Sequence, residues 1–262
     1  MDILQTIIAH KQQEVERQRE AVSLATMIEL ADLCMDCPTR SLRKALAASE
    51  TGIIAEFKRK SPSKGWLHPG AKVADVVPLY AEAGAAACSI LTDSQFFGGS
   101  IADLQQARQR VSLPLLRKDF IINPYQLFQA RVIGADAVLL IAACLSPEQC
   151  AELAKTAHSL QLEVLLEVHD AKELDHVNEH IDLLGVNNRH LGTFHTDVEQ
   201  SFALVERLKG CAPLLISESG ISQADTVKQL RKAGFKGFLI GETFMKTAHP
   251  GETLRQFINQ LR

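Results

Sequence analysis

The sequence has little of what marks a nucleic-acid-binding, membrane-spanning or secreted protein. Aromatic residues make up 5% of the 262 residues and are not interleaved with a basic stripe, so we expect no nucleic-acid partner. No apolar run reaches about 18 residues, the length that crosses a bilayer, so we expect no membrane span or membrane partner. The N-terminus lacks a basic region followed by an apolar core, so we expect no signal peptide.

The sequence also lacks a complete metal motif and a disulfide framework. Among six cysteines, Cys34 and Cys37 form one CxxC pair, but no second pair completes a zinc site. Three others lie in or beside apolar runs, where a free thiol packs as a small hydrophobe: Cys88, Cys144 and Cys211. We therefore expect unligated thiols, no metal, and a reducing cytoplasmic location.

What is present begins with a helical segment. Residues 1–48 predict an N-terminal helical extension that covers part of the core, because apolar residues recur near helical spacing. Lys11 and Glu14 fall among the polar residues between them. A second helix is predicted around Met27, and Ser41 is predicted to cap a third.

From residue 52 onward, short apolar runs alternate with amphipathic stretches. The runs are apolar until their last positions, as expected for parallel strands buried on both faces. They are Gly52–Phe57, Ala87–Thr92, Pro114–Asp119, Ala137–Ala142, Leu162–Val168, Leu183–Asn188, Leu214–Ser219 and Gly237–Glu242. The predicted helices are Val73–Ala83, Ile101–Val111, Pro124–Ile133, Pro147–Leu160, Ala171–Glu179, Val198–Lys209, Ala224–Ala233 and Pro250–Leu261. This alternation predicts an α/β protein, a (β/α)8 TIM barrel.

We expect one domain, residues 1–262, with residues 1–48 as its N-terminal extension, because no linker or low-complexity segment interrupts the pattern. A doubly wound open sheet is the structural alternative. It usually has fewer strands and a glycine-rich dinucleotide-binding turn after the first one. Here the first predicted strand is followed by RKSPSKG, which favours the barrel.

Polar side chains collect at the carboxyl ends of the predicted strands, where barrel active sites lie. Glu56 and Lys58 end the first run and point the same way, because strand side chains alternate between faces. Lys118 ends the third run and Glu167 the fifth. The sixth, seventh and eighth runs end in Asn187-Asn188-Arg189, Ser217-Glu218-Ser219-Gly220 and Gly241-Glu242. An ion pair or helix cap explains any single charge, but two lysines and two carboxylates on one rim favour a site.

The loops after the last two strands predict a phosphate site. They contain Ser219-Gly220-Ile221 and Gly241-Glu242-Thr243, at the positions where barrels often bind phosphate. Glycine lets backbone N–H groups approach an anion, and two ordinary turns are the alternative.

The first loop and several phenylalanines predict a covered, partly aromatic pocket. About a dozen residues, Arg59 to Gly70, follow the first strand, against the usual two to six, and we expect a mobile lid there. Phe97 and Phe120, with Leu191, can enclose an aromatic ring, while core packing is the alternative.

Seven segments together closely resemble the indole-3-glycerol phosphate synthase family: IAEFKRKSPSKG, SILTDSQFFGGS, LLRKDFIINPYQ, LLEVH, GVNNR, ISESGI and FLIGETFM. The resemblance spans residues 53–245 and includes the N-terminal extension. It implies conversion of 1-(2-carboxyphenylamino)-1-deoxyribulose 5-phosphate to indole-3-glycerol phosphate, CO2 and water. It also implies no metal or organic cofactor and a phosphorylated small molecule as the partner. We expect a monomer, with a homodimer as the alternative.

The resemblance further implies the catalytic roles. Lys118 is the general acid that protonates the substrate ketone, and we expect an apolar mouth to lower its pKa. Glu167 shuttles protons and stabilises the cationic intermediate. Lys58 binds the substrate carboxylate and assists loss of the hydroxyl, while Glu56 holds Lys58 in place.

The remaining implied roles concern substrate binding. Asn187 and Ser219 orient the substrate hydroxyls and carboxylate. Phosphate is held by Ser61, Gly220, Gly241 and the Glu242 backbone, and the aromatic ring by Arg189, Pro62, Phe97, Phe120 and Leu191. His190 and His195 stand where the family often has acidic residues, and we expect them on the surface. The other histidines are expected to be solvated.

Three other functions stay open at this point. A Schiff-base aldolase acting on a phosphosugar also uses a barrel lysine. A sister isomerase needs an acid–base pair but releases no CO2. A phosphate-binding barrel without catalysis would have no use for two inward lysines.

Overall fold

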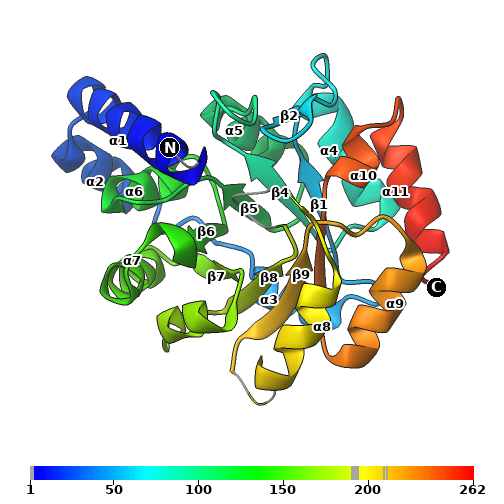
Figure 1. Cartoon of the computed structure of the whole chain (residues 1–262). Coiled ribbons are helices and arrows are strands. Elements are labelled where there is room, and N and C mark those ends of the chain that lie inside the picture. Colours follow the sequence, from blue (N-terminus) through cyan, green and yellow to red (C-terminus); the bar gives the residue numbers. More distant parts are fainter. Residues whose placement is uncertain (1–2, 190–194, 209, 211) are drawn as a thin grey trace.

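The computed structural model describes residues 3–189, 195–208, 210 and 212–262. Parallel strands close into a barrel with helices around it, as Figure 1 shows, which confirms the predicted TIM barrel. The barrel strands are β1 (Ile53–Phe57), β4 (Ala87–Leu91), β5 (Leu115–Lys118), β6 (Ala137–Ile141), β7 (Glu163–Val168), β8 (Leu183–Asn187), β9 (Leu214–Glu218) and β10 (Gly237–Ile240). The strands follow chain order around the ring, and β10 pairs with β1.

The outer helices follow the predicted positions with two differences. They are α4 (Val73–Ala83), α5 (Ile101–Arg110), α6 (Pro124–Val132), α7 (Pro147–Ser159), α8 (Glu199–Val205), α9 (Ala224–Ala233) and α11 (Pro250–Asn259), with the 3-10 helices η1 (Ala142–Cys144), η2 (Ala171–His176) and η3 (Glu206–Leu208). The stretch predicted as helix 171–179 forms only η2, which ends where the His176 ring bonds to the Leu145 carbonyl. A short helix, α10 (Glu242–Met245), follows β10, where the sequence predicts a phosphate-binding loop with an ordinary turn as the alternative.

The N-terminal extension contacts both ends of the barrel. It consists of α1 (Ile3–Ala21), α2 (Leu24–Leu33) and α3 (Leu42–Ala48). The helices α1 and α2 lie beside α6, as Figure 1 shows. At the opposite end, Leu42 and Leu46 of α3 are buried in the barrel's interior cluster. The Ser41 hydroxyl accepts the Lys44 N–H, which confirms the predicted cap.

The inward faces of the strands change from apolar to charged along the barrel axis. A layer of buried apolar side chains is formed by Ile54, Leu116, Leu165 and Ile216. Two residues further along the same strands are Glu56, Lys118, Glu167 and Glu218. Because strand side chains alternate with a period of two, the apolar layer and the charged layer share the inward face. The strand register therefore delivers the charges to one end of the barrel.

The long first loop is folded rather than irregular. Its strands β2 (Lys60–Ser61) and β3 (Gly65–Trp66) form an antiparallel hairpin. Arg59, just before the hairpin, donates to both carboxylate oxygens of Asp103 at 2.6 and 2.8 Å. The hairpin thus has a fixed base, and its movement as a lid stays a prediction. Among the described residues, no helix combines the length and apolarity needed to cross a bilayer.

Candidate active site

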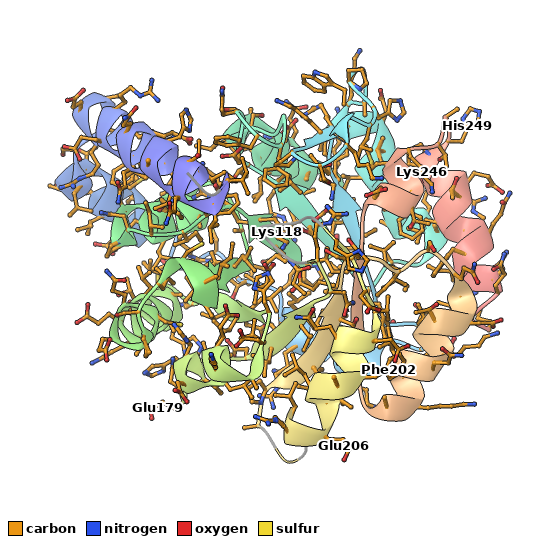
Figure 2. All side chains as sticks on the ribbon, in the orientation of Figure 1. Lys118, Glu179, Phe202, Glu206, Lys246 and His249 are labelled. Carbon is orange, nitrogen blue, oxygen red and sulfur yellow. The ribbon has the colours of Figure 1, made fainter. Side chains whose placement is uncertain are left out.

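A cavity of about 560 Å³ opens at the carboxyl ends of the strands. The predicted site residues that line it are Glu56, Lys58, Pro62, Phe97, Lys118, Phe120, Glu167, Asn187, Arg189, Ser219, Gly220, Gly241 and Glu242. Figure 2 labels Lys118 close to the centre of the ring in this view. Two predicted positions stand apart. Ser61 is buried in the hairpin, where its hydroxyl accepts the Lys64 N–H at 3.3 Å, and Leu191 lies outside the described residues, as does His190.

The ammonium group of Lys118 lies between two buried carboxylates. Its Nζ donates to Glu167 Oε2 at 2.8 Å and to Glu218 Oε2 at 3.1 Å. Burial alone lowers the pKa of Lys118, but the negative charges of Glu167, Glu218 and Glu56 outweigh it and raise the pKa above its usual range. The predicted lowering of this pKa is therefore wrong, because the mouth is lined with carboxylates as well as apolar groups.

Glu167 is held from three directions. Its Oε1 accepts the Asn187 side-chain N–H at 2.9 Å, and its Oε2 accepts the Lys118 ammonium. His169 Nε2 lies 3.5 Å from Oε1. Burial alone raises the pKa of Glu167, but the positive charges of Lys118 and His169 outweigh it and lower the pKa. Glu167 is therefore ionised at neutral pH.

His169 is largely buried, so the expectation that it is solvated is wrong. Its side chain is 11% exposed, and its Nδ1 lies 3.4 Å from Glu173 Oε2. Burial alone lowers the pKa of His169, but the bond to Glu173 and the charge of Glu167 raise it. The ring therefore supports the negative charge of Glu167 at Oε1, whereas Lys118 contacts Oε2. By contrast, His195 is exposed at the cavity opening, as expected.

Glu218 is the site residue to which the sequence analysis gave no role. It is 1% exposed, and its Oε1 has no hydrogen-bond partner among the described residues. Burial, with the nearby charge of Glu167, raises the pKa of Glu218 to about 7, although Lys118 opposes the shift. The alternation along β9 indicates it, because Ile216 and Glu218 share the inward face.

A missing side chain on β8 makes room for Glu218. A Cβ atom at Gly185 would lie 2.1 Å from Glu218 Oε1, which is closer than any real contact. Gly241 makes similar room after β10, because a Cβ there would lie 2.4 Å from Glu56 Oε1. Both glycines are therefore needed for the carboxylates to point inward.

Lys58 and Glu56 form a second ion pair at the same end of the barrel. Lys58 Nζ lies 2.5 Å from Glu56 Oε1, and both side chains line the cavity. Glu56 belongs to β1 and Lys58 directly follows it, and their ion pair in the cavity agrees with the predicted common face. The site therefore contains two lysines, each paired with a carboxylate.

The rim formed by the loops after β8, β9 and β10 brings together the predicted binding residues. Arg189 donates to Glu242 Oε2 at 3.1 Å, and its backbone N–H donates to Asn187 Oδ1 at 3.0 Å. The Glu242 side chain therefore faces Arg189. Ser219 has a φ of 66°, an unusual backbone conformation that directs the chain into Gly220. No metal cluster of three or more His, Cys, Asp or Glu is found within the described residues.

This arrangement suits proton transfer better than amine nucleophilicity. A raised pKa keeps Lys118 as an ammonium, which can donate a proton, whereas Schiff-base formation needs a neutral amine. Glu167 and Glu218, which share that ammonium, are positioned to accept protons in turn. Gly220 and Gly241 also line the cavity, where their backbone N–H groups can approach an anionic group.

Comparisons with known proteins identify close relatives. The family model described as indole-3-glycerol phosphate synthase matches residues 4–257. A protein named indole-3-glycerol phosphate synthase from Bacteroides thetaiotaomicron is 56% identical, covering 100% of this chain and 99% of the relative. One of the same name from Delftia acidovorans is 43% identical, covering 97% of each.

Solved structures with the same fold are more distant. A mutant tryptophan synthase alpha-subunit from Pyrococcus furiosus has a TM-score of 0.61 at 15% identity, covering 81% of this chain and 98% of that one. Tryptophan synthase subunit alpha from Legionella pneumophila has a TM-score of 0.63 at 14% identity, covering 86% of this chain and 100% of that one. These likenesses concern the barrel fold alone.

Proposed function

The chain belongs to the indole-3-glycerol phosphate synthase family, and we propose that Lys118, Glu167 and Lys58 carry its chemistry. The protein is a carbon–carbon lyase of tryptophan biosynthesis. It converts 1-(2-carboxyphenylamino)-1-deoxyribulose 5-phosphate to indole-3-glycerol phosphate, CO2 and water. The observation that carries the assignment of roles is the Lys118 ammonium held between two buried carboxylates.

Lys118 acts first, as the general acid of ring closure. It gives a proton to the ketone oxygen while the carboxyl-bearing ring carbon bonds to the ketone carbon. The raised pKa of Lys118 supports this role, because the proton is present on the enzyme at neutral pH. The carboxylate then leaves as CO2, and the electrons of the broken bond return to the ring.

Dehydration completes the indole. Lys58, which first binds the substrate carboxylate, donates a proton to the departing hydroxyl, and water leaves. Glu167 accepts the proton lost from the substrate and stabilises the cationic intermediate through its negative charge. Glu56 holds Lys58 in place through their 2.5 Å ion pair. Asn187 and Ser219 orient the substrate hydroxyls and carboxylate.

The substrate is proposed to lie across the cavity with its two ends held differently. The phosphate contacts the backbone at Gly220, Gly241 and Glu242. Its contact with Ser61, which is buried in the hairpin, requires the predicted movement of that loop. The aromatic ring lies among Pro62, Phe97, Phe120 and Arg189, and the predicted contact with Leu191 lies outside the described residues. No cofactor takes part in these steps. We further propose a single domain spanning residues 1–262, a monomer and a cytoplasmic location.

A direct assay tests the function. The purified protein is mixed with the carboxyphenylamino substrate, and the indole product is followed by fluorescence while released CO2 is measured. We expect fluorescence and CO2 to rise together in equal amounts. A product without CO2 would indicate the isomerase instead, and an adduct trapped by borohydride would indicate the aldolase. Unchanged substrate would overturn the proposal.

A further inference from the structure

Lys11 is a buried cation outside the active-site cavity. It lies on the buried stripe of α1 between Ile7 and Val15, at a spacing of four residues from each. It is 1% exposed, although lysine is almost never fully buried unless it is paired. It is not among the residues that line the cavity. The burial of the Lys11 ammonium therefore requires charged partners around it.

Three carboxylates surround the Lys11 ammonium. Its Nζ lies 2.8 Å from Asp119 Oδ1, 3.0 Å from Asp93 Oδ2 and 2.9 Å from Glu14 Oε2. Asp93 and Asp119 are both buried and follow the neighbouring strands β4 and β5. Burial alone lowers the pKa of Lys11, but these carboxylates raise it above its usual range. Lys11 therefore stays charged and joins two strand ends.

Each of the two carboxylates also holds a loop that carries a phenylalanine of the cavity. Asp93 Oδ1 accepts the Phe96 N–H at 2.7 Å and the Phe97 N–H at 3.2 Å. Asp119 Oδ1 accepts the Phe120 N–H at 2.8 Å. The rings of Phe97 and Phe120 lie 6.0 Å apart at their centroids, and both line the cavity. One cation thus holds both of the loops that present these rings.

The two loops depend on Lys11 to different degrees. Asp119 has other charged and polar partners, because Arg117 donates to its Oδ2 at 3.1 Å and Thr92 at 2.5 Å. For Asp93, Lys11 is the charged partner seen within the described residues, and the remaining contacts of its carboxylate are the backbone N–H groups of its own loop. Loss of the Lys11 charge should therefore displace Phe97 more than Phe120.

We propose that Lys11 is a positioning residue that sets the separation of the Phe97 and Phe120 rings and so the fit of the substrate's aromatic ring. This inference rests on the proposed function. It assigns a role in substrate binding to a residue of the N-terminal extension that does not touch the substrate. We expect the apolar contacts of the aromatic ring with Phe97 and Phe120 to be kept during ring closure, so their loss should raise KM and leave kcat nearly unchanged.

The test compares Lys11→Met with a matched control at the other end of the barrel. Arg108→Met also removes one cation from an ion pair with a buried aspartate, because Arg108 Nη1 lies 2.6 Å from Asp136 Oδ2. Both variants are expected to lower Tm. We expect KM to rise about tenfold in Lys11→Met alone, with kcat within about threefold of the parent protein. Equal KM values in the two variants would overturn the inference.

A double-mutant cycle separates positioning from general destabilisation. If Lys11 acts through Phe97, adding Lys11→Met to Phe97→Ala should change KM by less than about twofold, because the contact is already lost. Full additivity of the two effects on KM would contradict the inference. If Lys11→Met does not fold, the Asp93→Asn variant tests the inference instead. The asparagine keeps an oxygen that accepts the Phe96 and Phe97 N–H groups, but it removes the ion pair with Lys11. It must then raise KM.

The parent protein assayed in parallel keeps the two proposals distinct. Absence of indole formation by the parent protein contradicts the proposed function. Normal indole formation with an unchanged KM in the folded Lys11→Met variant contradicts only the role of Lys11.

Discussion

Buried or partly buried carboxylates lie at both ends of the barrel, and their hydrogen-bond partners differ. At the amino ends of the strands, Asp136 accepts the backbone N–H groups of Arg40 and Leu115 as well as Arg108. Glu163 accepts the Ser41 hydroxyl and the Arg43 N–H. At the carboxyl ends, Glu167 and Glu218 accept from side chains only, and Glu218 Oε1 has no partner within the part of the chain described.

The difference separates stability from chemistry within one fold. Carboxylates bonded to backbone N–H groups cannot move or change charge without disturbing strand ends, so they fix the barrel and the N-terminal extension. Carboxylates bonded to a lysine and facing a cavity can exchange protons with a substrate. This agrees with the general rule that barrel chemistry lies at the carboxyl ends of the strands.

The largest expected effect tests the charged end directly. Lys118→Met should lower kcat by about 10³-fold, because it removes the general acid. Its Tm should also fall, because Glu167 and Glu218 then stay buried without their cationic partner, so kcat is measured at a temperature where the variant is folded. Indole fluorescence gives kcat, and Lys228→Met on the surface of α9 is the control. Full turnover by Lys118→Met would show that the acid lies elsewhere.

Gly185→Ala sharpens the comparison by moving one carboxylate without removing it. The new Cβ displaces Glu218, and a misplacement of about 1 Å can cost about 100-fold, so kcat/KM should fall between about tenfold and 100-fold. Gly70→Ala is the control, because no atom lies within 4 Å of its added Cβ. Normal activity in Gly185→Ala would mean that the position of Glu218 is unimportant.

Asp136→Asn tests the opposite end. Breaking a buried ion pair costs about 3 kcal/mol, so the urea midpoint should fall while kcat/KM stays within about twofold of the parent value. Urea unfolding followed by circular dichroism gives the midpoint, and the fluorescence assay gives kcat/KM. A large loss of activity in the folded variant would break the separation between the two ends.

The smallest expected effect is a change in how stability depends on pH. Burial raises the pKa of Glu218 from 4.5 to about 7, so the folded protein favours its protonated form. Its contribution to stability is therefore present below about pH 4.5 and lost as the pH rises through about 7. Glu218→Gln should raise Tm by a few degrees at pH 8 and by less at pH 5. A lower Tm at pH 8 would contradict the raised pKa.

The fold and much of the site could be predicted from local patterns. Apolar runs of strand length gave the barrel strands, and the ends of those runs gave Lys58, Lys118 and Glu167. The period of two also indicates Glu218 as an inward-facing residue. The adjacent Ser219-Gly220 pair, however, indicates a phosphate loop, and this second signal hides the first.

What could not be predicted depends on residues far apart in the sequence. The helical spacing places Lys11 among the polar residues between apolar positions, yet it lies on the buried stripe of α1 and contacts Asp93 and Asp119. The direction of the Lys118 pKa shift depends on how many carboxylates surround it, which only the closed barrel determines. The hairpin in the first loop has strands of two residues each, too short for a periodic signal.

The closure of one end of the barrel by α3 limits how substrate and products enter and leave the cavity. Leu42 and Leu46 pack against the apolar layer that contains Ile54 and Ile216, so the described residues leave no second exit along the barrel axis. Substrate, CO2, water and indole-3-glycerol phosphate must then enter or leave through the same opening of the cavity. The small products can leave past a bound indole, but a new substrate must wait for the larger product to depart. Inhibition by the product is therefore expected to be competitive with the substrate.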